Sequence, residues 1–365
     1  MFNVLSIMRR ELLAYFTSPI GYLFIMVFVT VSVGLYITTF FAFPVADMRQ
    51  FFGNLPLMLC IFIPAVTMRV WAEERKENTW EMLLTFPMKA WELVLGKYLA
   101  SFVFFLIALA ATGTVPAMLI SLGNPDAGAI AGGYLGTILL GAMFLALGIF
   151  VSGFFKDQIV AFVVTLLACF LLFLLGTDFV AGTIDATLPG VGSFLSDVLG
   201  LLNHYNSFTI GVVELVDIAY FLVWTGLFLF LNILYVDGRN RPNVQIVFGS
   251  ATALCLGIGL AFNWLATNES LLRLDLTEDN IYTVSDASEE ILASLPSPVQ
   301  VTYYVSPQDG MPTQLRALEQ DVTAKLRELE IASDGRLQHK VVHLEAANLV
   351  AAGQRAMTPP EEEEG

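Results

Sequence analysis

The chain has 365 residues, of which 56% are hydrophobic and only 14% charged, and its formal net charge is −15 at pH 7. Soluble domains carry about 25% charged residues, so this composition excludes an ordinary soluble protein and predicts an integral membrane protein. The acidic balance also excludes nucleic acid as a partner, because no basic stripe is present to neutralise phosphates.

The charge is distributed unevenly along the chain. Residues 1–266 carry 11 Lys and Arg against 15 Asp and Glu, whereas residues 267–365 carry 7 against 18. An acidic, soluble appendage is therefore expected after a nearly balanced membrane part. The cysteines Cys60, Cys169 and Cys255 all lie in apolar segments, so they indicate neither a disulfide framework nor a zinc site.

Residues 1–19 predict an amphipathic helix that lies in the membrane interface and ends at Ser18-Pro19. Its expected apolar face consists of Leu5, Met8, Leu12, Tyr15 and Phe16. The apolar run that begins at Ile20 is too long for the core of a signal peptide and has no small-residue cleavage pattern, so it should stay as a first span.

Seven apolar runs are long enough to cross a hydrocarbon core about 30 Å thick. They cover residues 20–43, 54–72, 98–121, 129–153, 158–180, 218–236 and 245–266. The predicted fold class is therefore mainly α, a polytopic helical membrane bundle. We divide it into a membrane domain at 20–242 and an additional span at 243–267.

Loop charges predict the orientation of the bundle. If the N-terminus is inside, ten Lys and Arg residues fall on the inner side and only Arg49 falls in an outer connection between spans. The inner residues are Arg9, Arg10, Arg69, Arg75, Lys76, Lys89, Lys97, Lys156, Arg239 and Arg241. The sequence thus predicts a multi-pass protein of the cytoplasmic (inner) membrane, with membrane lipids around it, a cytoplasmic N-terminus and an external, periplasmic C-terminal domain.

The charged insert at 73–87, between the second and third spans, is the most informative stretch. Glu73, Glu77 and Glu81 recur every four residues, which places them on one helical face. Trp71, Trp80, Leu83 and Leu84 supply an apolar underside. Asn78 tolerates a left-handed conformation and should divide the insert in two, with Thr79 capping the next turn. From charge alone, a solvated loop that only fixes orientation is the alternative.

This insert resembles the coupling-helix signature of ABC-2 type transporter permeases, E-x-x-R-x-x-G-T-x-E-x-L-L-x-x-P. Residues 79–87 read Thr-Trp-Glu-Met-Leu-Leu-Thr-Phe-Pro, and Asn78 stands where the family usually has Gly. In that family the element docks onto a separate ATP-binding subunit. The resemblance therefore implies ATPase docking by Glu73, Glu74, Arg75, Glu77, Thr79, Glu81 and Leu84. Residues 9–22 also resemble the opening of the gliding-motility-type subfamily.

The outer connection at 181–217 is half apolar, lacks basic residues and contains a helix-like piece near 192–202. The pattern that follows, His-aromatic-x-Ser-Phe-x-x-Gly, resembles the same gliding-type subfamily. In ABC-2 permeases such a region dips back as short helices that close an outer gate, which implies gate roles for His204, Tyr205, Phe208 and Gly211. The alternative is a surface loop in which His204 only forms hydrogen bonds, since a single histidine is no ligand set.

The composition changes near residue 268. A strand at 299–305, an amphipathic helix through Leu315 to Leu329 and a second strand near 341–344 predict a β-α-β unit. We assign 268–357 to a partial external α/β domain and 358–365 to an acidic, disordered tail. The motif D-L-T-x-x-x-x-Y-x-x-S, residues 275–285, resembles the auxiliary gliding-motility subunit, so the chain resembles a permease fused to the start of that partner.

Ion-coupled carriers usually have ionisable residues near the middle of their spans, whereas the spans of this chain have none there. The sequence also has no phosphate-binding loop of the form G-x-x-x-x-G-K-[ST]. We therefore expect a non-catalytic permease subunit that binds no cofactor, with ATP and Mg²⁺ on a partner ATPase. The expected assembly contains two permeases, which are either two copies of this chain or one copy and a relative. It also contains an auxiliary external subunit. The rival hypothesis is a non-transporting scaffold that passes force or assembly signals to surface machinery. A polytopic enzyme is less favoured, because no clustered catalytic set is visible.

Overall fold

The computed structural model describes residues 2–42, 47–80, 82, 88–187, 190–238, 244–267, 273–278, 282–284, 288, 291–292, 297–306, 316–333 and 336–343. These residues fall into two compact units, Met1–Glu278 and Asp279–Gly365. The first unit is the helical bundle and the second holds a small α/β fold.

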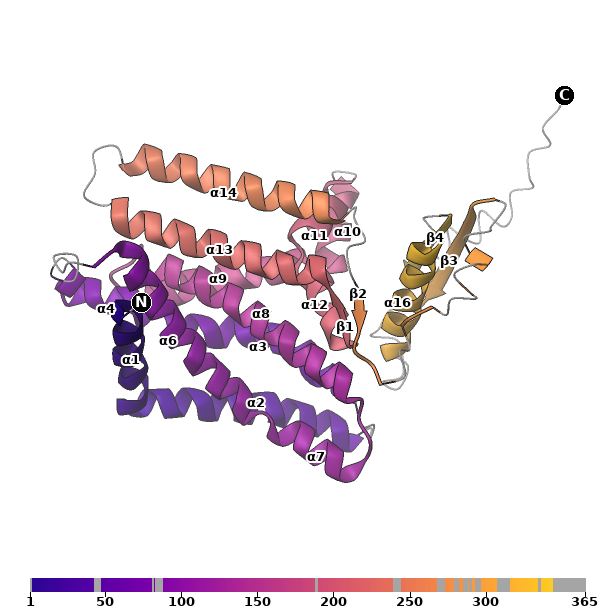
Figure 1. Ribbon diagram of the computed structural model, residues 1–365, viewed down its shortest axis with the longest axis horizontal. Helices are drawn as coiled ribbons and strands as arrows, with labels where there is room; N and C mark the ends of the chain where they lie inside the picture. The colour runs from indigo at the N-terminus through magenta and orange to yellow at the C-terminus, as the bar shows by residue number, and fades with distance from the viewer. Residues whose placement is uncertain are drawn as a thin grey trace. The chain divides into compact units, whose positions relative to one another are not determined.

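The bundle consists of helices that run between two ends (Figure 1). Its elements are α1 (Phe2–Thr17), α2 (Pro19–Ala42), α3 (Arg49–Thr67), α4 (Arg69–Lys76), α6 (Ala90–Ala111), α7 (Thr114–Leu122), α8 (Ala127–Ser152), α9 (Gln158–Leu175), α10 (Asp178–Thr187), α11 (Val191–Leu199), α12 (Leu201–Thr209), β1 (Val212–Glu214), α13 (Leu215–Gly238), α14 (Val244–Thr267) and β2 (Arg273–Asp275).

Seven of these helical stretches are long and apolar enough to cross a membrane, which confirms the seven predicted spans. Helix α8 forms the centre of the bundle, since every residue from Leu139 to Ile149 is buried. Helices α3, α6, α9, α12 and α13 all pack against it. A helix that is apolar all round is expected in such a central position.

The two ends of the bundle carry different structures. Helices α1 and α4 lie at one end, and α10, α11, α12 and the β1–β2 pair lie at the other (Figure 1). The charged insert and the short helices of the outer connection therefore sit at opposite ends of the membrane helices. This separation is what the alternation of seven spans requires.

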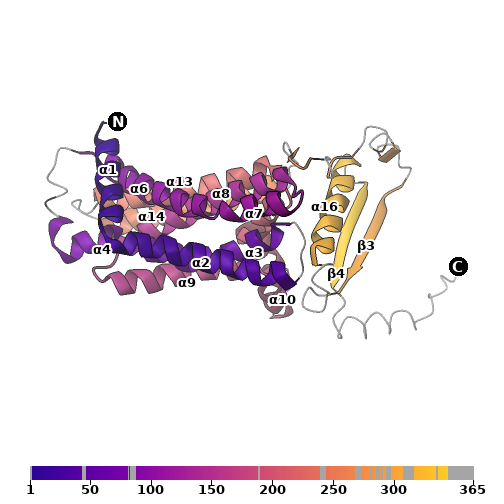
Figure 2. The ribbon, with the colours of Figure 1, turned by 90° about the horizontal axis from the view of Figure 1, so that it is seen from below.

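Helix α1 turns sharply into α2 and lies across the direction of the spans in both views (Figures 1 and 2). It packs along α6, where Gly96 lets the helices approach closely: a Cβ at this position would lie 2.7 Å from the Ile7 side chain. Its buried residues are Ile7 and Tyr15, whereas Leu5 is 60% exposed. The predicted face is thus packed at Leu12, Tyr15 and Phe16 but not at Leu5, and Ile7 is an additional buried residue that the prediction did not include.

The second unit contains β3 (Val299–Val305), α16 (Arg316–Ala332) and β4 (Leu337–His343). Strands β3 and β4 pair in parallel with Val299 opposite Leu337, and α16 packs on β4 (Figure 2). The β-α-β unit predicted from hydrophobic periodicity is confirmed. The predicted tail at 358–365 lies outside the described residues.

Candidate functional site: the α1–α4 end and the gate end

The end of α4 has the backbone turn that the sequence predicted. Helix α4 stops at Lys76, the Glu77 amide donates to the Glu73 carbonyl at 2.9 Å, and Asn78 has a φ of +57°. Asparagine and glycine are the residues that adopt this left-handed region most readily. Position 78, where the coupling-helix signature has Gly, is thus occupied by Asn, the residue best able to replace it.

Two tryptophans form the underside of this turn. Trp71 and Trp80 are buried, and their rings meet edge to face with centroids 4.9 Å apart. Glu73, Glu77 and Thr79 remain exposed on the other side. The predicted amphipathic division is therefore observed up to Trp80. Glu81 and Leu84, which complete the expected docking set, lie outside the described residues.

Arg75 faces the bundle and holds α4 in place. Its guanidinium donates to the Gly153 carbonyl after α8 and to the Tyr235 hydroxyl of α13, the latter at 3.4 Å, and lies 6.0 Å from the Trp80 ring. These contacts fix the orientation of the turn relative to two spans. Arg75 thus supports the exposed residues from behind.

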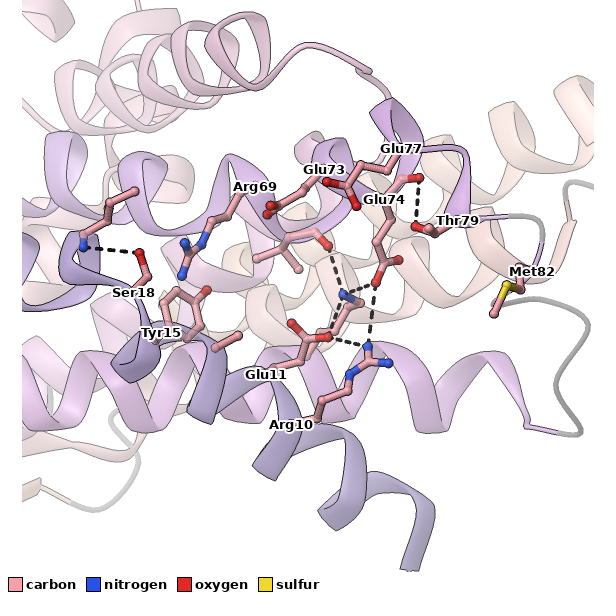
Figure 3. Close-up of a pocket in the computed structure, with 14 residues that line it drawn as sticks. Arg10, Glu11, Tyr15, Ser18, Arg69, Glu73, Glu74, Glu77, Thr79 and Met82 are labelled. Carbon is pink, nitrogen blue, oxygen red and sulfur yellow. Dashed lines mark hydrogen bonds and ion pairs between the residues drawn. The ribbon is translucent and has the colours of Figure 1, made fainter.

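Glu74 also points inward, into an ion cluster with Lys97, Glu11 and Arg10; Figure 3 labels Glu74, Glu11 and Arg10. The Lys97 ammonium, only 2% exposed, lies 2.7 Å from Glu74 Oε1 and 3.1 Å from Glu11 Oε1, and it donates to the Val70 carbonyl at 3.0 Å. Arg10 closes the cluster, 2.6 Å from Glu11 and 3.8 Å from Glu74. The four side chains neutralise one another and join α1, α4 and α6.

The cluster changes the acidity of Glu11. Burial raises the pKa of this carboxyl, but the Lys97 ammonium and the Arg10 guanidinium outweigh burial and hold the pKa below its usual value of about 4.5. Glu11 is therefore ionised in the folded protein at neutral pH. Each charge in this half-buried cluster has an opposite partner, as buried charges require.

A pocket of about 660 Å³ separates α1 from α4 and has this cluster as one wall (Figure 3). Arg69, Tyr15 and Ser18 lie on another side of it, and Glu73 and Glu77 lie along α4 (Figure 3). Ile20 also lines the pocket. The Arg69 guanidinium stacks over the Tyr15 ring at 4.4 Å. The pocket thus combines charges of both signs at the point where α1 turns into α2.

Sequence reasoning missed Lys97 as a site residue, because it was counted only as an inner-loop cation. Helix α6 begins at Ala90, so Lys97 lies two turns inside it and is covered by α1. A basic residue directly before a span, facing acidic residues in two neighbouring segments, was the available signal. Sequence alone does not say which of these segments come together.

The end of the bundle that carries α10, α11 and α12, called the gate end after the role predicted for α12, brings together residues from three elements around His204. This side chain, 7% exposed, has its Nδ1 atom 2.7 Å from Asp217 Oδ1 at the start of α13, and its ring stacks on Tyr220 at 4.1 Å. Asn263 of α14 reaches its other ring nitrogen at 3.5 Å. The histidine forms hydrogen bonds, as the simpler interpretation expected, but it is buried and not part of a surface loop.

The other three predicted gate residues also fix α12. Tyr205 donates to the Phe52 carbonyl of α3 at 2.9 Å and contacts the Thr137 hydroxyl of α8 at 3.1 Å. Phe208 is fully buried. Gly211 has a φ of +85°, which favours glycine, and its carbonyl accepts a bond from the Leu276 amide at 3.0 Å. His204, Tyr205 and Phe208 therefore hold α12 in the bundle, and Gly211 joins the segment after α12 to Leu276.

The segment after α14 returns to this same end. Strand β2 pairs antiparallel with β1, with Val213 opposite Leu274, and Arg273 lies 3.9 Å from Glu214. Residues 273–278 thus belong to the helical unit, although the sequence placed the start of the external domain at 268. We call residues 273–277 the strap.

Comparisons with known proteins agree with this division. Residues 44–268 match a family described as ABC-2 family transporter protein, and residues 278–362 match a domain of unknown function, DUF7088. No curated protein matches the chain. The first match covers the region from the start of α3 to the end of α14.

Proposed function

We propose that this chain, which belongs to the ABC-2 family of transporter membrane proteins, moves a substrate out of the cell with energy from a separate ATP-binding subunit. Membership of this family makes it a multi-pass membrane permease component, and it implies an ABC ATP-binding partner. ATP and Mg²⁺ are bound by that partner, since this chain carries no phosphate-binding loop.

One observation carries the docking role of residues 73–87: exposed carboxylates stand on a rigid turn at one end of the bundle. Glu73 and Glu77 face outward, while Trp71, Trp80 and Arg75 tie the same turn to α8 and α13. A rigid turn of this kind can transmit movement of a docked subunit to the spans. Glu74 contributes through the ion cluster that joins α4 to α1 and α6.

The proposed assembly goes beyond the ATP-binding partner that the family implies. Two permeases, identical or related, bind two ATPase subunits, and closure of the ATPases rocks the spans. The turn at Asn78 faces the cytoplasm, and the gate end with His204 and Tyr205 faces outward, as the loop charges predict. The gliding-motility-type subfamily remains a prediction from residues 9–22 and 204–211.

The docking role is tested by reversing two carboxylates. In E77K/E81K, attraction to a basic groove on the ATPase becomes repulsion, and truncating one partner of a buried charge pair costs about 2–5 kcal/mol. We expect ATPase retained on affinity purification to fall to background, with an unchanged amount of permease in the membrane. Retention should be measured in low and high salt.

A matched control reverses a charge on the same turn in the other direction. K76E alters an exposed residue of α4 but leaves the carboxylate face intact, so it should retain the ATPase. If E77K/E81K retains the ATPase normally and is present in the membrane at a normal level, the docking role is wrong. The segment is then a solvated loop that only fixes the topology of the spans.

A second function, the scaffold, is favoured by the strap. Strand β2 lies directly before the DUF7088 region in the sequence and pairs with β1, which joins the gate helix α12 to α13. Force on the spans would thus reach the chain that leads into the external domain. Purified with its ATPase in vesicles, a transporter shows substrate-stimulated hydrolysis and substrate movement, and a scaffold shows neither.

A further inference from the structure

The pocket between α1 and α4 contains charges that the ion cluster does not satisfy. Lys97, Arg10, Glu11 and Glu74 neutralise one another on one wall. Arg69 and Glu73 lie outside that cluster, and among the described residues neither has an ion pair or a side-chain hydrogen bond. Outside the cluster, the pocket therefore offers the Arg69 guanidinium and two carboxylates, Glu73 and Glu77, of which Glu73 lies one helical turn from Arg69.

These two charges have a defined spacing. Arg69 and Glu73 are four residues apart on α4, so they project from the same face about one helical turn from each other. Such pairs commonly form an ion pair, but here the guanidinium turns onto the Tyr15 ring, 4.4 Å away. The geometry leaves space between a positive and a negative group, which fits a ligand that carries both charges.

The chemistry of the two groups selects a phosphate and a primary ammonium. A guanidinium binds phosphate oxygens through two parallel N–H donors, and a carboxylate accepts from the N–H donors of an ammonium. The Ser18 hydroxyl lines the same wall as Arg69. A volume of about 660 Å³ lies within the range of small-molecule sites.

The position of the pocket favours a lipid as the source of this headgroup. Ile20, which is 51% exposed, lines the pocket at the first turn of the span α2, and Leu23 on the next turn is 58% exposed. Acyl chains below a headgroup in the pocket would run along these apolar residues. Helix α1 crosses the direction of the spans above them, as an interfacial helix does (Figure 2).

We propose that Arg69 and Glu73 bind the headgroup of an aminophospholipid, with its phosphodiester on Arg69 and its ammonium on Glu73. The site shares Glu73 with the proposed docking set, and Glu77 also lines the pocket; the lipid test therefore uses the chain without ATPase. Phosphatidylethanolamine is the simplest lipid with this chemistry. The headgroup would lie on α4 beside Ser18, where α1 turns into α2, and so link the lipid leaflet to the helix that ends before Asn78.

The test uses the purified full-length chain, without ATPase, in detergent micelles doped with single lipids. Retained lipid is counted by native mass spectrometry, and the thermal midpoint is followed in parallel. We expect phosphatidylethanolamine to bind roughly tenfold more tightly than phosphatidylcholine, whose quaternary ammonium has no N–H donor, or phosphatidylglycerol, which has no cation. R69Q and E73Q should each remove this preference.

K76Q is the matched control, because Lys76 lies on the same helix, is exposed and does not line the pocket. Circular dichroism and gel filtration verify that each variant is folded. Equal binding of the three lipids, or unchanged preference in R69Q, would overturn the proposal. Equal affinity for soluble glycerophosphoethanolamine would overturn the lipid as its source. Because no ATPase is present, failure here leaves the docking experiment unaffected.

Discussion

Lys97 is the residue on which the α1–α4 end depends most directly. Its ammonium, 2% exposed, is shared between Glu11 and Glu74, and both carboxylates are largely buried. Removing one partner of a buried ion pair leaves uncompensated charge and costs about 3–5 kcal/mol. We expect K97M to lower the thermal midpoint of the purified protein clearly, as followed by tryptophan fluorescence.

Two variants control this prediction. K76M removes an exposed lysine from the last turn of α4 and should leave the midpoint unchanged. The triple variant K97M/E11M/E74M removes the carboxylates as well and should recover part of the loss, since apolar replacements of a whole buried cluster are well tolerated. A midpoint in K97M equal to wild type would mean that the cluster contributes nothing to stability.

The same cluster predicts how stability depends on pH. The folded-state pKa of Glu11 lies below its usual value of about 4.5, so the unfolded chain takes up protons at a higher pH than the folded one. The contribution of Glu11 is therefore complete above pH 4.5 and is lost as the pH falls through the folded pKa. Thermal midpoints of wild type and E11Q, measured from pH 7 to pH 3, should converge at the acidic end. A constant difference across that range would contradict the ionised state assigned to Glu11.

At the scale of elements, the sequence did not predict that the strap pairs with β1 as an antiparallel strand. Each strand has three residues, too few to show a periodicity, and some 60 residues separate them in the chain. The spans were predictable because a long apolar run has few alternatives. The turn at Asn78 was predictable because left-handed backbone selects Asn and Gly locally. Pairings between distant segments, such as Tyr205 with Phe52, leave no local signal.

The strap can be tested by its register. Val213 lies opposite Leu274, and directly opposed residues in an antiparallel pair have Cα atoms about 4.5–5.5 Å apart, within the range of a disulfide. V213C/L274C should therefore cross-link under mild oxidation in a background without the native cysteines. V213C/L276C, the diagonal pair at about 7–8 Å, should cross-link much more slowly. Similar rates for both pairs would contradict the observed register.

At the scale of the whole molecule, the order of the spans predicts that the charged insert and the α12 region lie at opposite ends of the bundle. Seven spans alternate in direction, so segments separated by an odd number of spans must lie at opposite ends. The order of apolar runs thus determines which segments share an end. It does not determine how Lys97, Glu11 and Glu74 meet there, because that depends on the packing of α1 against α6.

The odd number of spans also predicts on which sides the chain ends lie. Inner loops are expected to hold ten Lys and Arg residues against Arg49 outside, which places the second unit outside the cell. A cysteine at Ser306, exposed after β3, should then react with a membrane-impermeant thiol reagent in spheroplasts. E77C, exposed directly after α4 in the helical unit, should react only after lysis. The native cysteines Cys60, Cys169 and Cys255 are buried, so the background is low. Labelling of Glu77→Cys with protection of Ser306→Cys would mean that the bundle is inverted, and the docking turn would then face away from every ATP-binding subunit in the cytoplasm.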